Sequence, residues 1–109
     1  MRETEIEKYL VKQSKIHGGK CYKFVSPQNS GVPDRILLIK GYTIFIETKA
    51  PNGKPRPLQK KVHQEMREYG ALVMVINTKE QVDDLFNDLD SRRWHRCPLI
   101  TTTNKTNTK

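Results

Sequence analysis

The sequence predicts an α/β domain in which a mixed β-sheet of about four strands is flanked by helices. The spacing of apolar residues changes along the chain from a helical period to alternation and back, which gives the element order α-β-β-β-α-β-α. The helix between the third and fourth strands forms a crossover, and such a crossover makes the two strands parallel. With 109 residues, of which 35% are hydrophobic, the chain has room for one small domain.

The N-terminal third predicts one helix and one strand. Residues 3–16 place their apolar side chains on one helical face, and Gly18-Gly19 ends that helix. The face consists of Ile6, Tyr9, Leu10, Gln13 and Ile16. Residues 20–25 alternate as a half-buried strand does, and residues 26–33 form a loop rich in serine, proline, asparagine and glycine.

The middle of the chain predicts a hairpin. Residues 34–39 and residues 42–49 are two strands with largely apolar cores, and the tight turn Lys40-Gly41 joins them as antiparallel neighbours. Residues 51–57 contain three prolines and one glycine, so they form a loop rather than a further element.

The last part of the folded chain predicts a crossover helix, a buried strand and a final helix. The crossover helix covers residues 58–69. Its expected inner face consists of Leu58, Val62, Met66 and Tyr69. Residues 71–76 are almost continuously apolar, as in a buried parallel strand. Thr78 and Gln81 form a capping box that begins a helix ending near residue 89.

Composition divides the chain into a folded domain, residues 1–90, and a basic, polar and flexible tail, residues 91–109. The tail holds no acidic residue and carries five of the eight net positive charges. From residue 101 onward only threonine, asparagine and lysine occur, which is typical of disorder. The basic balance favours a polyanionic partner.

Cysteine and histidine usage gives no metal signature. Cys21 and Cys97 have no zinc-site spacing and form no disulfide framework, so we expect a reducing cytoplasm, that of the host if the protein is viral. His17, His63 and His95 show no ligand spacing. There is no charged-then-apolar leader and no apolar run near 18 residues, so we expect neither secretion nor a membrane partner.

The hairpin carries charged residues where its strands meet. Asp34 begins the first strand and Glu47 lies near the end of the second, so antiparallel pairing brings the two carboxylates together. Lys49 shares a strand face with Glu47 because side chains alternate. Two carboxylates within reach of each other favour a bound Mg²⁺ or Mn²⁺, to which the Thr48 backbone carbonyl could add a ligand. The alternative to a metal site is a solvated cross-strand ion pair without a catalytic role.

Together with three further stretches of sequence, these charged residues resemble a known family. Pro33-Asp34 followed by Glu47-Thr48-Lys49 is the pattern of the PD-(D/E)XK nuclease superfamily. The segments SGVPDR (residues 30–35), FIETK (residues 45–49) and PLQ (residues 57–59) resemble the stand-alone, single-domain members of the VRR-NUC family. The first helix and the strand after Gly18-Gly19 also match, so the resemblance spans residues 1–90.

The resemblance implies a restriction-endonuclease-like core and a metal-dependent DNA endonuclease. Asp34 and Glu47 would hold the metal, and Lys49 would act at the attacking water. The family's glutamate on the first helix falls on Glu3 as a further metal ligand, with Glu5 and Glu7 left open. The family's glutamine falls on Gln59, which would hydrogen-bond a water or a phosphate at the site.

The resemblance also implies branched or four-way (Holliday) junction DNA as the substrate and a homodimer that supplies two sites for two strands. The residues expected to contact DNA are Ser30, Lys54, Arg56, Lys60 and Lys61. Basic side chains of this kind position a duplex by its phosphates, although a merely solvated face would have the same composition. The competing function is a non-catalytic nucleic-acid-binding module on the same fold.

Overall fold

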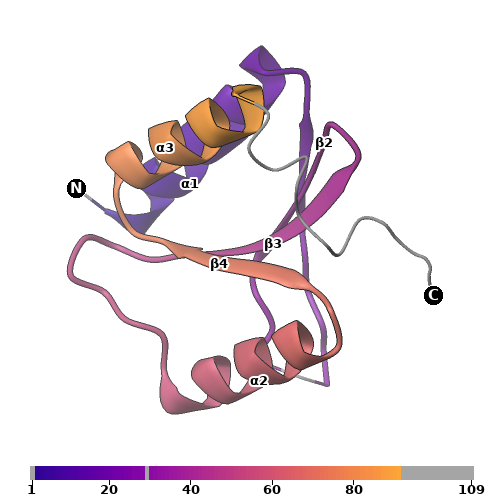
Figure 1. The fold of residues 1–109 in the computed structure, drawn as a ribbon. Coiled ribbons are helices and arrows are strands. Elements are labelled where there is room, and N and C mark those ends of the chain that lie inside the picture. Colours follow the sequence, from indigo (N-terminus) through magenta and orange to yellow (C-terminus); the bar gives the residue numbers. More distant parts are fainter. Residues whose placement is uncertain (1, 29, 92–109) are drawn as a thin grey trace.

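A four-stranded β-sheet lies between two layers of helices (Figure 1). The computed structural model describes residues 2–28 and 30–91. The elements are α1 (Glu3–Ile16), β1 (Lys20–Lys23), β2 (Arg35–Ile39), β3 (Tyr42–Thr48), α2 (Pro57–Glu68), β4 (Leu72–Ile76) and α3 (Lys79–Asp90). This order confirms the predicted architecture, and none of these helices is both long and apolar enough to cross a bilayer. The expected tail lies outside the described residues, except for Ser91.

The sheet is mixed, as the sequence predicts. Its strand order is β1-β2-β3-β4, with two antiparallel pairs followed by the parallel pair β3–β4. The turn between β2 and β3 has positive φ at Lys40 (51°) and Gly41 (86°), the geometry of a two-residue hairpin turn. In the resulting register Arg35 lies opposite Ile46, so the start of β2 lies beside the end of β3.

The main hydrophobic core lies between the sheet and the pair α1 and α3, which cover the same face (Figure 1). Its buried members are Ile6, Leu10, Leu37, Ile39, Tyr42, Ile44, Ile46, Ile76, Val82, Leu85, Phe86 and Leu89. Ile16 was expected on this face but is exposed. The buried stripe of α1 continues from Leu10 to Ser14, whose hydroxyl donates to the Leu10 carbonyl oxygen at 2.7 Å and is thereby satisfied.

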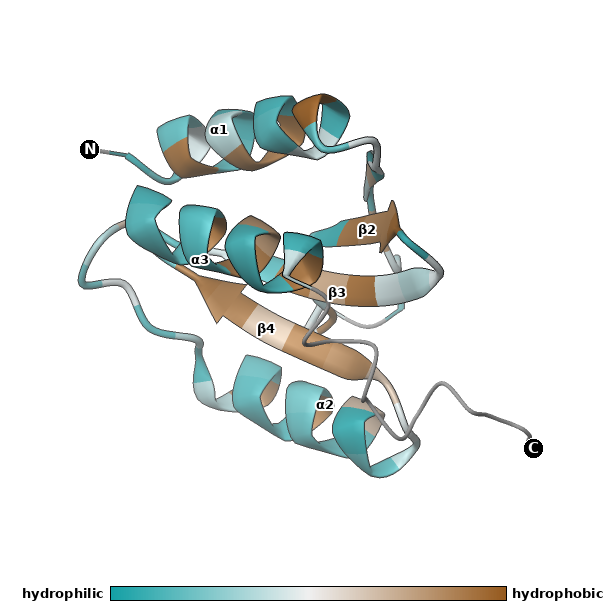
Figure 2. Ribbon diagram, turned by 45° about the horizontal axis from the view of Figure 1, so that its top comes forward, coloured by the Kyte–Doolittle hydropathy of each residue, from teal (hydrophilic) through white to brown (hydrophobic). Residues whose placement is uncertain are grey.

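The inner face of α2 differs from the predicted one. Leu58 and Tyr69 were expected inside, but they are 47% and 89% exposed, while Gln59, Val62 and His63 are buried. Figure 2 shows that α2 is largely hydrophilic, whereas β3 and β4 beside it are mostly hydrophobic. Val62 is buried as predicted, whereas Gln59 and His63 were not expected inside because apolar periodicity gives polar residues no weight.

The loop before β2 packs tightly against α2. A Cβ atom added at Gly31 would lie 2.6 Å from Cγ2 of Val62 and 3.0 Å from the carbonyl oxygen of Leu58. Real Cβ atoms do not approach backbone and branched side chains that closely. The glycine therefore lets the loop that leads into β2 touch the helix that carries Gln59.

We predict that Gly31→Ala destabilises the protein by about 1–3 kcal/mol, because the added methyl group overpacks the contact with α2. Chemical denaturation measures the change. Ser30→Ala is the matched control, since it alters an exposed side chain of the same loop and should leave the denaturation midpoint in place. Equal midpoints for Gly31→Ala and the wild type would contradict the tight packing.

Candidate active site

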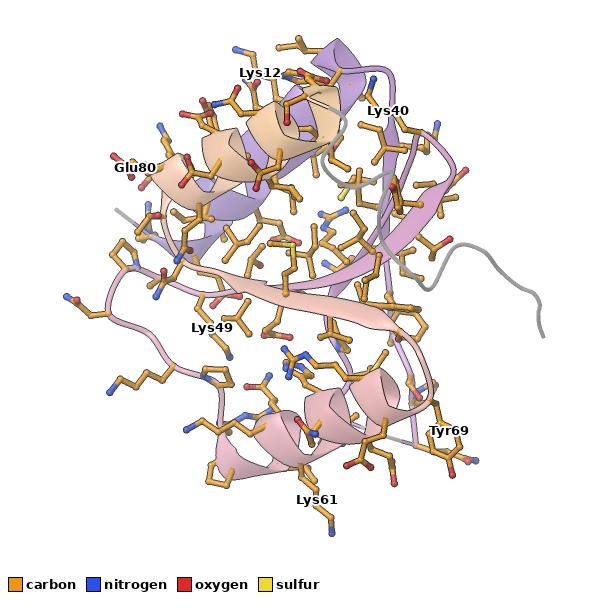
Figure 3. The ribbon with its side chains drawn as sticks, viewed as in Figure 1. Lys12, Lys40, Lys49, Lys61, Tyr69 and Glu80 are labelled. Atoms are coloured by element: carbon orange, nitrogen blue, oxygen red, sulfur yellow. The ribbon has the colours of Figure 1, made fainter. Side chains whose placement is uncertain are left out.

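The structure brings Asp34, Glu47 and Lys49 to one place at the end of β3. The Nζ atom of Lys49 lies 3.2 Å from Oε2 of Glu47. Figure 3 shows the Lys49 side chain extending from the end of β3 toward α2. Asp34 comes directly before β2, and the β2–β3 register continues to place it beside Glu47. The structure thus brings together the three side chains that the sequence placed at one edge of the sheet.

Thr48 orients the Asp34 carboxylate. The backbone N–H of Thr48 donates to Oδ1 of Asp34 at 3.1 Å, and the Thr48 hydroxyl donates to Oδ2 at 2.8 Å. Thr48 itself is fully buried. The sequence suggested only the backbone carbonyl of Thr48 as a functional group, so it missed this two-point clamp. A threonine directly after the strand glutamate is the signal that could have indicated it.

Gln59 reaches the same carboxylate as Lys49. Its Nε2 atom donates to Oε2 of Glu47 at 3.2 Å, while its Oε1 atom accepts from the Arg56 backbone N–H at 2.9 Å. The second contact fixes which end of the amide faces Glu47. Gln59 is buried, which agrees with the site position implied by the resemblance and not with a solvated helix surface.

The two carboxyl groups resist ionisation. Burial raises the pKa of Asp34, against which the two hydrogen bonds from Thr48 act. Burial also raises the pKa of Glu47, and the charge of Asp34 raises it further, while Lys49 lowers it. A pair of carboxylates that repel each other in a half-buried site gains stability from a cation placed between them.

The three candidate glutamates on α1 have different partners. Glu5 accepts from the backbone N–H of Arg2 at 2.8 Å and caps the helix. Glu7 forms an ion pair with Arg35, with Oε2 2.8 Å from Nε. The charge of Glu3 raises the pKa of Glu47 and the charge of Glu7 raises the pKa of Asp34, so both glutamates lie within electrostatic reach of the site.

The oxygen donors suit a hard divalent cation. Asp34 and Glu47 supply two carboxylates, whose pKa values are raised first by burial and, for Glu47, then by the charge of Asp34. Within the described residues, no group of three or more histidine, cysteine or acidic side chains is assembled as a metal cage. Two carboxylates, with the remaining positions left to water and substrate oxygens, is a common arrangement for Mg²⁺.

His63 is the site-face residue that sequence reasoning missed. It is 1% exposed and lies one helical turn after Gln59 on the buried face of α2. Its pKa is lowered by burial first and then by the charges of Arg67 and Lys49. Its spacing of four from Gln59 could have indicated a shared face.

Exposed basic side chains lie on the loop and the helix that follow β3. Those expected to bind DNA, on the loop before α2 and on α2 itself, are all exposed, as is Ser30. The Nη2 atom of Arg56 lies 3.5 Å from the Ser30 carbonyl oxygen and links the two segments. A groove of about 440 Å³ runs beside the Glu7–Arg35 ion pair, and Lys8, Lys12 and Lys15 of α1 line it.

Known proteins similar to this chain agree on one family. "Putative nuclease p44" of Acyrthosiphon pisum secondary endosymbiont phage 1 is 43% identical over 81 residues, which are 73% of this chain and 87% of that protein. A solved structure described as a VRR_NUC domain is 34% identical, with a TM-score of 0.72, and the match covers 78% of this chain and 94% of that one.

A second solved structure, a VRR_NUC domain protein, is 20% identical with a TM-score of 0.62 over 83% of this chain and 86% of its own, which supports the fold alone. No protein-family model matches the sequence. The identity to the first two proteins extends over most of their length, and the folds agree. The chain therefore belongs to the VRR-NUC family.

Proposed function

We propose that the protein is a metal-dependent DNA endonuclease whose active site consists of Asp34, Glu47, Lys49 and Gln59. The observation that carries this proposal is the convergence of two carboxylates and a lysine, the last 3.2 Å from Glu47, at one end of the sheet. A structural ion pair would need one acid and one base. The charge of Asp34, the second carboxylate, raises the pKa of Glu47, and a cation bound between the two groups would relieve this repulsion.

The proposed cation is Mg²⁺ or Mn²⁺, held by Asp34 and Glu47 with the Thr48 carbonyl and Glu3 as further donors. When bound, it supplies Lewis-acid chemistry to the phosphodiester and to a water nucleophile. Thr48 holds the Asp34 carboxylate in a fixed orientation through two hydrogen bonds. Lys49 contributes a positive charge that orients the water or offsets negative charge developing on the phosphate. Gln59 keeps Glu47 in place through its amide.

The proposed substrate is branched DNA, including four-way junctions, cut by a homodimer. The exposed cations on the loop before α2 and on α2 would hold phosphates on one side of the site. The groove that contains the Glu7–Arg35 pair is also lined by Lys8, Lys12 and Lys15 of α1, a second set of cations. Two sets of cations on different elements suit a substrate with more than one duplex arm.

The test is cleavage of linear, flapped and four-way junction DNA with and without Mg²⁺ or Mn²⁺. We expect metal-dependent cleavage that is fastest on the branched substrates, and light scattering should give twice the 12.7 kDa mass of one chain. DNA binding without cleavage under every metal condition would instead indicate the non-catalytic binding module. A monomer that resolves four-way junctions fully would contradict the dimer.

Substitution of a metal ligand and substitution of the lysine should have different effects on metal binding. Asp34→Asn should abolish metal binding and cleavage, yet stabilise the metal-free protein by on the order of 0.5 kcal/mol, because the amide can still bond Thr48 while one repelling charge is lost. Lys49→Ala should still bind metal and DNA, but its cleavage rate should fall roughly a hundredfold or more. Calorimetric metal titration beside cleavage assays measures both effects.

Lys40→Ala is the matched control for the lysine, because Lys40 lies in the turn at the other end of β3. It should cleave at the wild-type rate. Wild-type cleavage by Asp34→Asn would rule out the proposed site altogether.

The raised pKa values of Asp34 and Glu47 determine how Mg²⁺ affinity and the stability of the metal-free protein change with pH. A cation needs both groups deprotonated, so Mg²⁺ affinity should start to fall at a pH above the ordinary carboxyl values of 3.8 and 4.5. The folded state binds these protons more tightly than the unfolded state does. The metal-free protein should therefore gain stability as the pH falls through the raised pKa values, and Asp34→Asn should reduce that gain. Calorimetric titrations and denaturation from pH 8 to about pH 5 test both expectations.

A further inference from the structure

Among the buried side-chain nitrogen and oxygen atoms in the described part of the chain, one has no hydrogen-bond partner, and it belongs to His63. The Nε2 atom of His63 is enclosed, and the residue is 1% exposed. A buried polar atom without a partner costs free energy, so such an atom in a folded protein needs an explanation. Nothing in the proposed mechanism so far uses this imidazole.

His63 lies on the same side of α2 as the group that holds Glu47. Gln59, one turn earlier, donates to the Glu47 carboxylate at 3.2 Å, and both side chains belong to the buried face of the helix. Arg67, one turn later, donates to the Val73 carbonyl oxygen at 3.1 Å and is thus committed elsewhere. Burial and the charges of Arg67 and Lys49 lower the pKa of His63, which favours the neutral imidazole, in which one ring nitrogen keeps a lone pair.

The Lys49 ammonium forms its ion pair with one oxygen atom of the Glu47 carboxylate. Its side chain is 16% exposed, and its ammonium lies 3.2 Å from Oε2 of Glu47, the oxygen that Gln59 also contacts. A divalent cation on Glu47 would draw electron density from that carboxylate and repel the ammonium beside it. The displaced ammonium, still largely out of water, needs another acceptor on the α2 side of the sheet.

We propose that His63 is a positioning residue for Lys49. When a divalent cation occupies the Glu47 carboxylate, the Lys49 ammonium moves from Glu47 and donates a hydrogen bond to Nε2 of His63, directly or through one water. This inference rests on the proposed function, since the cation is part of it. The hydrogen bond requires the imidazole tautomer with its proton on Nδ1, and it adds no charge that would compete with the cation.

The direct test follows the ¹⁵N resonances of the histidines during a Mg²⁺ titration of the DNA-free protein. In the wild type we expect the His63 Nε2 resonance to move upfield from that of an unprotonated, unbonded nitrogen, while His17, paired with Asp90 at 2.8 Å, stays in place. In Lys49→Met the cation should bind and the Nε2 resonance should stay, because the donor is missing. An unmoved resonance in wild-type protein that binds Mg²⁺ would overturn the inference.

Cleavage kinetics provide the second measurement. His63→Leu fills a similar volume without an acceptor and should lower kcat roughly tenfold, with KM for DNA and Mg²⁺ affinity unchanged. His63→Gln keeps a side-chain acceptor and should restore most of the rate. Gln64→Leu, at the neighbouring exposed position of α2, is the matched control and should cleave as the wild type does.

The outcomes separate the two proposals. If wild-type protein binds no Mg²⁺ and cuts no DNA, the proposed function fails and this inference fails with it. If wild-type protein binds Mg²⁺ and cuts DNA while His63→Leu matches its kcat, only the role of His63 is overturned. The resonance shift decides the matter even if His63→Leu fails to fold, because it uses the wild type and Lys49→Met.

Discussion

The pairing of Asp34 with Thr48 is the contact on which the rest of the site depends. Two hydrogen bonds, from the Thr48 amide and hydroxyl, join the chain entering β2 to the end of β3. A slip of one residue between these strands would turn every side chain of one strand to the opposite face of the sheet. The clamp and the two-residue turn at the far end of the hairpin together hold the register that puts Asp34 beside Glu47.

The two faces of the sheet have separate tasks. The face under α1 and α3 carries the apolar core, and its buried side chains come from β2, β3 and β4. Between the other face and α2 lie Glu47 of β3 and Gln59 and His63 of α2, which are buried although they are polar. Stability from the first face offsets the free-energy cost of crowding polar groups on the second. A site of this kind lowers stability for function, and loss of a site charge can therefore stabilise the fold.

Each group at the site is held by a partner whose own position is fixed. The Gln59 amide is oriented by the backbone N–H of Arg56 at the start of α2, and α2 is held against the loop before β2 by the close approach at Gly31. Arg35, next to Asp34, is held by Glu7 of α1. The site thus draws on α1, α2 and the β2–β3 hairpin at once, and this explains how a small domain can preorganise it.

The sequence by itself determined the order of elements, the mixed sheet and the meeting of Asp34, Glu47 and Lys49. These follow from local signals: apolar periodicity, the Lys40-Gly41 turn and the alternation of side chains along a strand. The resemblance carried by the same motifs added Gln59, which the structure places against Glu47. Such signals act within one element or between two elements joined by a short turn.

Only the tertiary structure decided which polar residues of the helices face the site. A pattern of apolar residues does not distinguish Glu3, Glu5 and Glu7. The structure does, because it pairs Glu5 with the Arg2 backbone N–H and Glu7 with the Arg35 side chain. The rotation of α2 and the burial of His63 depend on packing against the sheet and the loop at Gly31. Hydropathy ranks side chains by their cost of leaving water, whereas a buried polar residue is placed by partners distant in sequence.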